Sequence, residues 1–105
     1  MEFLIEITDL AIEDAEAYVR LIRDENQEPE AAERWFRGLL DSIYSLEVFP
    51  ERCPLIPEQG QFSFEIRQLI YFSHRVIYAV KQDGRVVIYR VYHGSRRRLA
   101  PGDLH

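Results

Sequence analysis

The chain has 105 residues, of which 47% are hydrophobic, and its 18 Asp/Glu against 13 Lys/Arg give a net charge of −5. This length and apolar content fit one domain over residues 1–105 with one small core. No apolar stretch reaches the roughly 18 to 20 residues that span a bilayer, and Met1-Glu2-Phe3 lacks the basic start of a signal peptide, so we expect a cytoplasmic protein without a membrane partner.

The first predicted elements are a strand and an amphipathic helix. Residues Phe3 to Ile7 are apolar and partly β-branched, and they lead into Thr8-Asp9, either of which can cap a helix. Apolar residues then recur at three- and four-residue spacing, which predicts a helix that ends near Asp24. These residues are Ala11, Ala15, Tyr18 and Ile22.

A second helix is predicted from Pro29, after the turn Asn26-Gln27-Glu28, to Phe49-Pro50. Proline is favoured at a first helical position, and a wide apolar stripe follows it. The stripe consists of Ala32, Trp35, Phe36, Leu39, Leu40, Ile43 and Leu46. We expect the two helices to form a helical hairpin, with at least one of Trp35 and Phe36 deeply buried.

The rest of the chain predicts three strands. Residues 50–62 are rich in proline and form an irregular connection. Strands are then expected at Phe64 to Ile70, His74 to Val80 and Val86 to His93, and Asp83-Gly84 joins the last two as a hairpin because it tolerates positive φ.

The element order predicts an α+β fold, β-α-α-β-β-β. A small, largely antiparallel sheet should pack against the helical hairpin, because the helical stripe is the apolar surface large enough to cover it. We expect the final residues, Ala100 to His105, to be a frayed tail.

Alternation along the strands assigns side chains to faces. We expect Arg67 and Arg75 to project from the same side of the sheet. In the last strand two alternating sets each contain three large residues, so apolarity leaves open which set faces the helices. His93 is assigned to the open face because a buried histidine beside Tyr89 would lack an obvious partner. An alternative for Arg75 and Arg90 is a structural role, in pairs with helical Glu or at strand ends.

Charge is unevenly distributed along the chain. Residues 1–60 carry fifteen Asp/Glu against five Arg, whereas residues 61–105 carry three Asp/Glu against eight Lys/Arg. The run Arg96-Arg97-Arg98 is the densest part of this basic half, and such a run is typical of a flexible tail or of a contact with an anionic partner.

Several kinds of chemistry are disfavoured by spacing. Ser95 and His93 lie two residues apart without a glycine-flanked elbow, which argues against a hydrolase that would use Asp103 as a third member. His74, His93 and His105 lack metal-ligand spacing, and the single Cys53 is expected to be an inert thiol. We therefore expect neither a metal nor a cofactor.

Five segments, in this element order, carry a family resemblance. They are Pro29-Glu30-Ala31-Ala32, Phe49-Pro50-Glu51-Arg52, Ile66-Arg67-Gln68-Leu69, His74-Arg75-Val76-Ile77-Tyr78 and Val87 to Arg97. Together they resemble the RelE/ParE superfamily of bacterial toxins from type II toxin–antitoxin modules. The resemblance covers nearly the whole chain, and its most specific part is the His-Arg-Val-Ile-Tyr strand followed by a strand that ends in His and basic residues.

The resemblance implies two alternative targets. RelE-like members are ribosome-dependent mRNA endonucleases, and in that branch Arg67, Arg75 and His93 would stabilise the phosphate and move the proton. ParE-like members inhibit DNA gyrase, and for them the contact would come from Arg96, Arg97, Arg98 and Leu99. A third possibility is a non-toxic relative that only binds an antitoxin.

The departures from the nuclease pattern favour the gyrase branch. Glu65 stands where nucleases tend to place Lys, no Tyr follows Tyr92, and an isoelectric point near 5.2 opposes entry into an RNA-lined cleft. In each case the implied partner is a cognate antitoxin that folds onto the helical hairpin and approaches the sheet, forming a hetero-oligomer.

Overall fold

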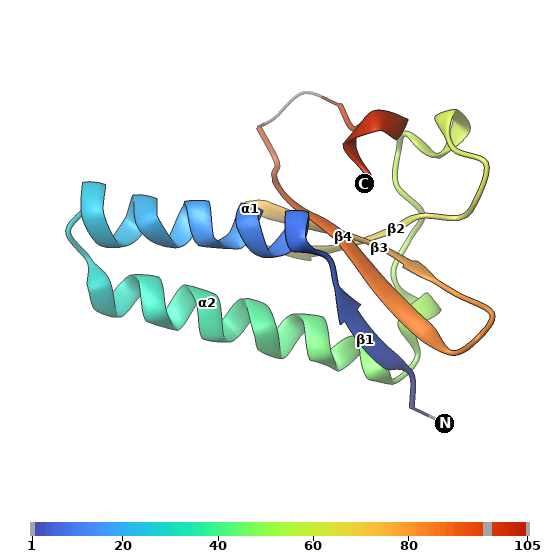
Figure 1. Ribbon diagram of the computed structural model, residues 1–105, viewed down its shortest axis with the longest axis horizontal. Helices are drawn as coiled ribbons and strands as arrows, with labels where there is room; N and C mark the ends of the chain where they lie inside the picture. Colours follow the sequence, from blue (N-terminus) through green and yellow to red (C-terminus); the bar gives the residue numbers. More distant parts are fainter. Residues whose placement is uncertain (1, 96–97, 105) are drawn as a thin grey trace.

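The computed structural model describes residues 2–95 and 98–104, and within them four strands form one sheet beside a helical hairpin (Figure 1). The elements are β1 (Leu4–Ile7), α1 (Asp9–Arg20), α2 (Pro29–Tyr44), β2 (Arg67–Tyr71), β3 (His74–Val80) and β4 (Arg85–His93). The predicted α+β class and the order β-α-α-β-β-β are confirmed. In the same residues no helix is both long enough and apolar enough to cross a membrane.

β4 is the strand on which the sheet is built. The strand order is β1-β4-β3-β2, with β1 parallel to β4 and the other pairs antiparallel. The β3–β4 hairpin turns at Asp83-Gly84, and Gly84 has a φ of 89°, which a side chain would strain. β4 is therefore paired on both sides along its first half, and its backbone connects β1 to the rest of the sheet.

The helices begin at the predicted positions, but α2 ends earlier than predicted. The Thr8 hydroxyl accepts a hydrogen bond from Ala11 N at 3.2 Å, and so caps α1. Helical turns continue from α1 through Leu21–Glu25, which agrees with the predicted end near Asp24. α2 ends at Tyr44, before the predicted Phe49-Pro50, and a short 3₁₀ turn follows it. Phe49 precedes a proline, which disfavours helical backbone there.

A β-bulge divides β4. Tyr78 pairs with Ile88, but its neighbour Ile77 pairs with Arg90, so Tyr89 has no directly paired residue on β3. The bulge shifts the alternation of side chains by one residue.

Because of this shift, neither of the two alternating sets expected for the last strand keeps to one face of the sheet along the whole strand. Val86 and Ile88, before the bulge, belong to the helix-side core together with Val91, after the bulge. His93 pairs with His74 and lies on this same side. The expectation that His93 lies on the open face is wrong, because a simple alternation cannot register an extra residue.

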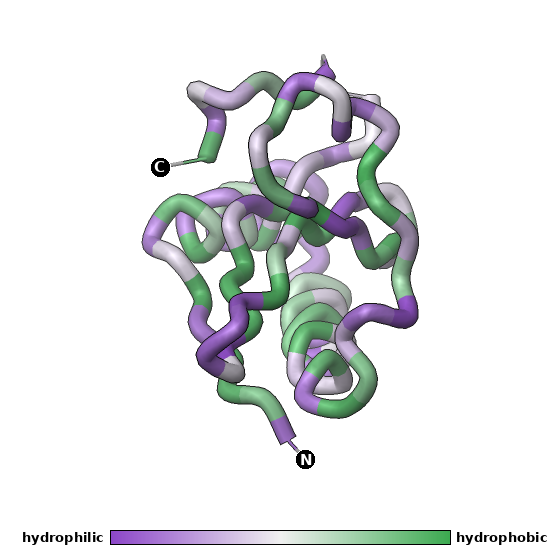
Figure 2. Tube along the Cα trace, turned by 90° about the vertical axis from the view of Figure 1, so that its right-hand side faces the viewer, coloured by the Kyte–Doolittle hydropathy of each residue, from purple (hydrophilic) through white to green (hydrophobic). Residues whose placement is uncertain are grey.

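The main core lies between the helical hairpin and one face of the sheet. Its buried members include Ala11, Ala15, Leu39, Ile43, Leu46, Val76, Tyr78 and Ile88. Trp35 and Phe36 pack against this core but are both only partly buried, so the expectation of a deeply buried residue there is wrong. In Figure 2 green and purple segments alternate along the chain, as expected of elements with one buried face.

The opposite face of the sheet is covered as well. A further cluster joins Ile77 and Tyr92 of the sheet to Ile56, Ile66 and Leu99. In Figure 1 the C-terminal segment, in red, lies beside the yellow-green loop near residue 60 on this side. The helical stripe is therefore not the only apolar surface that covers the sheet.

The C-terminal segment is ordered, which corrects the expected frayed tail over Ala100 to His105. Pro101–Asp103 forms a 3₁₀ turn, and the Asp103 carboxylate accepts a hydrogen bond from Ala100 N at 2.8 Å. Leu104 packs against the cluster around Leu99. His105 lies outside the described residues.

Replacing Gly38 by alanine should destabilise the fold although it favours the helix. The Tyr71 hydroxyl crosses α2 at this glycine and donates a hydrogen bond to Trp35 O at 2.8 Å, so an added methyl group would collide with it. Alanine gains about 1 kcal/mol in helix propensity, but overpacking costs about 1 to 3 kcal/mol. Urea unfolding should show a lower free energy of unfolding for Gly38→Ala. A matched Gly60→Ala variant, with open space around its Cβ, should lack the collision. A more stable Gly38→Ala would contradict the packing argument.

Candidate functional site

Arg67 and Arg75 lie on opposite faces of the sheet, so the expected shared face is wrong. Arg67 pairs with Tyr78, which belongs to the helix-side core, whereas Arg75 pairs with Tyr92, which belongs to the cluster on the other face. The register across the two-residue turn at Phe72 and Ser73 pairs odd-numbered residues of β2 with even-numbered residues of β3. Two odd-numbered residues on these strands therefore point to opposite sides.

Arg75 is held in a nearly buried ion pair. Its guanidinium donates to both carboxylate oxygens of Glu58, at 2.8 and 3.1 Å, and to Gln68 Oε1 at 2.7 Å. The Glu58 side chain is 2% exposed. Burial alone would raise the pKa of Glu58, but the hydrogen bonds from Arg75 and from Leu99 N hold that pKa below its ordinary value. The positive charge of Arg75 is therefore balanced within the protein by the carboxylate of Glu58.

Arg90 is held in the same way from helix α1. Its guanidinium donates to both oxygens of Asp14, at 2.7 and 2.8 Å, and to Asp103 O at 3.0 Å. It also lies over the Tyr92 ring, 4.9 Å from the centroid. The alternative structural role of Arg75 and Arg90 is therefore the one that the structure displays, although Glu58 belongs to a loop and Asp14 replaces the expected Glu.

Arg67 fastens the proline-rich connection to the sheet. It donates to Cys53 O at 2.7 Å and lies 3.5 Å from a carboxylate oxygen of the exposed Glu65. Residues Arg67, Arg75 and His93 thus have separate surroundings, and the structure does not bring them together around one phosphate.

His93 belongs to a group of aromatic rings between the end of the sheet and the helices. Its ring centroid is 5.0 Å from that of His74 and 6.3 Å from that of Tyr18. Trp35 from α2 completes the group, 5.1 Å from His74. His93 Nδ1 accepts a hydrogen bond from Ser95 N at 3.1 Å, so in the neutral ring the proton is assigned to Nε2.

Ser95 and His93 are in contact, but the contact is a local turn. Ser95 Oγ lies 2.6 Å from His93 Nδ1. A catalytic pair would also need a carboxylate that orients the imidazole. Asp14 and His93 both line a hollow of about 230 Å³. The Asp14 oxygens are already occupied by Arg90 and by Val91 N, which donates at 3.0 Å. Among the described residues, this contact gives no support to a hydrolase.

His74 is the buried titratable residue of this group. It is 4% exposed, and within residues 2–95 and 98–104 its Nδ1 has no hydrogen-bond partner. Burial, helped by the neighbouring His93, lowers the pKa of His74 to about 4, against a smaller opposing effect of Asp14. The ring is therefore neutral at physiological pH and acts as a packing element.

Among the residues expected to bind the target, those that the structure describes differ in exposure. Arg96 and Arg97 lie outside the described residues, and Arg98 is exposed. Leu99 is fully buried, so its side chain anchors the segment to the core, in contrast to the expected contact. The segment is a loop with two fixed ends rather than a tail, because Gly94 N donates to Ser73 O at 2.6 Å and Leu99 N donates to Glu58 at 2.8 Å.

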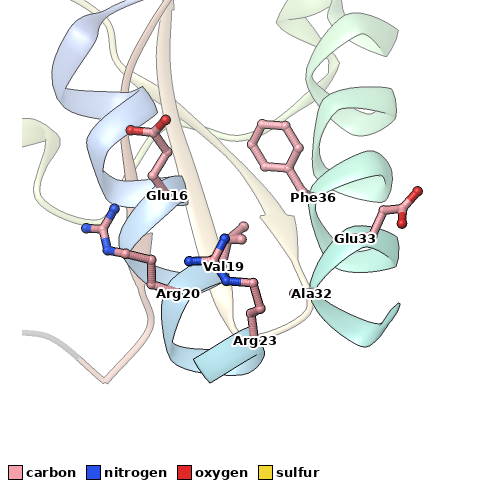
Figure 3. Close-up of a pocket in the computed structure, with 7 residues that line it drawn as sticks. All are labelled: Glu16, Val19, Arg20, Arg23, Ala32, Glu33 and Phe36. Carbon is pink, nitrogen blue, oxygen red and sulfur yellow. The ribbon is translucent and has the colours of Figure 1, made fainter. Parts of the chain in front are cut away.

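A groove runs between α1 and α2, as Figure 3 shows. It has a volume of about 340 Å³, and Phe36 of α2 points across it toward α1, while Glu33 points away. The lining residues are Glu16, Val19, Arg20, Arg23, Ala32, Glu33 and Phe36. This is the hairpin surface that sequence reasoning assigned to a partner.

Glu58 and Asp14 were missed by sequence reasoning. Asp14 carries a recognisable sign, because positions 11, 14, 15 and 18 follow the buried helical spacing and a carboxylate there requires a partner. Glu58 stands in an irregular loop, where no periodicity marks burial.

His74 should make the protein less stable in mild acid. The histidine titrates near 6.5 when unfolded and near 4 when folded, so the unfolded state binds more protons between these values. The contribution of neutral His74 to the free energy of unfolding is fully present above about pH 6.5. It decreases as the pH falls, by roughly 3 kcal/mol in total. Urea unfolding between about pH 7.5 and 4.5 should show this slope. His74→Phe should reduce it, and equal slopes in both proteins would refute the assignment to His74.

Comparison with known proteins agrees with this architecture. A family model, the ParE toxin of the type II toxin–antitoxin system parDE, matches residues 5–98. The structure is similar to a chain of the chromosomal ParDE system from P. aeruginosa, with a TM-score of 0.67 and 14% identity over 88% of this chain and 96% of that chain.

It is also similar to a chain of the RelBE2 toxin–antitoxin complex from Mycobacterium tuberculosis, with a TM-score of 0.59 and 20% identity over 89% of this chain and 99% of that chain. The curated proteins contain no match to the sequence. At these identities the two solved structures establish a shared fold, whereas the family model spans the chain from β1 to Arg98. The resemblance to the RelE/ParE superfamily is thereby confirmed, and the chain belongs to its ParE toxin family of type II toxin–antitoxin systems.

Proposed function

We propose that this toxin inhibits DNA gyrase, as a plasmid-stabilisation toxin would, and that a cognate antitoxin neutralises it in a hetero-oligomer. The observation that carries the proposal is the match to the ParE family model over residues 5–98, which includes both the helical groove and most of the basic loop. Such a target places the protein in the cytoplasm, where its unopposed action would arrest growth.

The placement of the arginines supports this target over mRNA cleavage. A nuclease of this superfamily would need Arg67, Arg75 and His93 to converge on one scissile phosphate. Arg67 and Arg75 point to opposite faces, and Arg75 is already paired with Glu58. Freeing Arg75 would leave a buried carboxylate unpaired, which is strongly unfavourable. Cleavage would therefore require a rearranged sheet surface.

The basic loop after β4 supplies the proposed contact with gyrase. Arg98 is exposed, and the sequence places Arg96 and Arg97 beside it. Gly94 and Leu99 are fixed on either side of these arginines, and Arg98 is bonded directly to the fixed Leu99, which limits what Arg98 would lose in conformational freedom on binding. The role of Leu99 in this proposal is to anchor the loop.

The α1–α2 groove is the proposed antitoxin site. Both similar structures come from toxin–antitoxin systems. The groove offers apolar Val19 and Phe36 together with Arg20 at the end of α1 and Arg23 in the helical turn that follows, where Arg23 pairs with Asp24. These features fit an amphipathic antitoxin helix with apolar anchors and acidic neighbours.

The groove can be tested with one charged substitution. Val19→Glu should weaken binding of the antitoxin encoded beside this gene by at least tenfold, because a carboxylate would be buried against an apolar helix. Val48→Glu is the matched control, since Val48 is 47% exposed at another hollow beyond the end of α2. Titration calorimetry with both variants checks this. Equal losses of affinity would place the antitoxin elsewhere.

The target can be tested with the loop arginines. Replacing Arg96, Arg97 and Arg98 together by Gln should reduce inhibition of gyrase supercoiling by tenfold or more, because these cations are proposed to meet an anionic surface. The substitution preserves Leu99, whose deletion would remove part of the core. Antitoxin affinity, which depends on the groove, should be unchanged.

A parallel reaction on programmed ribosomes separates the two targets. Intact protein should leave message uncut, and His93→Gln should retain gyrase inhibition, because His93 packs against rings and lies outside the proposed contact. Cut message on ribosomes, together with unaffected supercoiling, would assign the protein to the nuclease branch.

A further inference from the structure

Glu58 accepts hydrogen bonds from two segments that are far apart in the sequence. Its carboxylate accepts hydrogen bonds from the guanidinium of Arg75 on strand β3 and from the backbone N–H of Leu99 in the C-terminal segment. The residue is 3% exposed. A buried carboxylate is stable only when such donors satisfy it, so these three groups form one mutually dependent unit.

The loop that carries Glu58 is itself fixed. Gln59 donates from Nε2 to Phe64 O at 2.7 Å, and its Oε1 accepts from Ile66 N at 2.8 Å. Ile56 N also donates to Ile66 O at 2.9 Å. On the other side, Gln68 holds the Arg75 guanidinium. Glu58 and Arg75 are therefore also held by contacts that do not involve the C-terminal segment.

We infer that Glu58 is the positioning residue for Arg98 of the basic loop, because it fixes the adjacent Leu99 and so determines where Arg98 is presented to the target. This inference rests on the proposed contact between that loop and gyrase. Glu58 itself is buried and does not touch the target.

The opposite end of the loop has an independent anchor. Gly94 N donates to Ser73 O, and an added Cβ at Gly94 would lie 3.1 Å from that same oxygen, so the close approach favours glycine. Release of Leu99 would widen the range of positions open to Arg98, and binding would then have to order Arg98 again.

Loss of the Glu58 contact should act locally. Beyond Leu99, the segment is also held by Leu104, which packs in the same cluster, and by Asp103 O, which accepts from Arg90. The groove between α1 and α2 shares no residue with this network. A variant at Glu58 should therefore separate target inhibition from antitoxin binding.

The experiment compares Glu58→Ala and Glu58→Gln with Glu6→Gln. The last is a matched control, because Glu6 also pairs with an arginine, Arg85, but in an exposed bridge on β1. The measurements are hydrogen exchange of the Leu99 amide, gyrase supercoiling, antitoxin affinity and the urea midpoint. Glu58→Ala should speed Leu99 exchange and weaken gyrase inhibition, each by about tenfold or more, with antitoxin affinity unchanged. Glu58→Gln should be intermediate, because its amide oxygen can still accept from Leu99 N.

A double variant, Glu58→Leu with Arg75→Met, covers the case in which Glu58→Ala does not fold. Replacing both charges by apolar groups often preserves stability, and here it would still remove the acceptor for Leu99 N. This variant should show the same loss of gyrase inhibition. Fast Leu99 exchange combined with normal gyrase inhibition would overturn the positioning role.

The outcome also separates this inference from the proposed target. If the intact toxin does not inhibit gyrase, the gyrase assignment fails. Anchoring is then judged from exchange alone, and an unchanged Leu99 exchange rate in Glu58→Ala or in the double variant would overturn it.

Discussion

The β-bulge at Tyr89 is the constraint on which the two cores depend. It lies in β4, which pairs with both β1 and β3. Each residue of β4 after the bulge points to the face opposite to the one that simple alternation predicts. Helix α1 holds this irregular stretch, because the Thr8 hydroxyl donates to Tyr89 O at 2.9 Å and Asp14 accepts from Val91 N. The carbonyl of Tyr89 and the N–H of Val91 are thereby satisfied, and Val91 and His93 point toward the helices.

The same arrangement pairs the arginines of the sheet with carboxylates. Arg75 and Arg90 are taken by Glu58 and Asp14, and Lys81 lies 4.7 Å from the centroid of the Phe64 ring. Arg85 bridges Glu6 and Asp83. A positive balance counted along the sequence therefore does not become a positive sheet face. The C-terminal segment also packs on the face that carries Arg75, through Leu99 and Leu104.

The two surfaces proposed for partners are separate, and they differ in chemistry. The groove between α1 and α2 is apolar with charged edges, which suits a folded amphipathic helix. On the second surface Arg98 is exposed beside the fixed Leu99, which suits the proposed contact with an acidic surface on a larger target. This separation is the reason that substitutions should affect inhibition and neutralisation independently.

The sequence by itself determined the element order, the helical hairpin and the family, because these depend on local periodicity, turn chemistry and segments read in order. Only the tertiary structure decided the facing of His93, the separation of Arg67 from Arg75 and the burial of Leu99. A bulge, a strand register and a carboxylate supplied by a distant loop set these features. Each is a long-range pairing, and alternation along a single strand carries no information about the partner strand or about the segment that covers it.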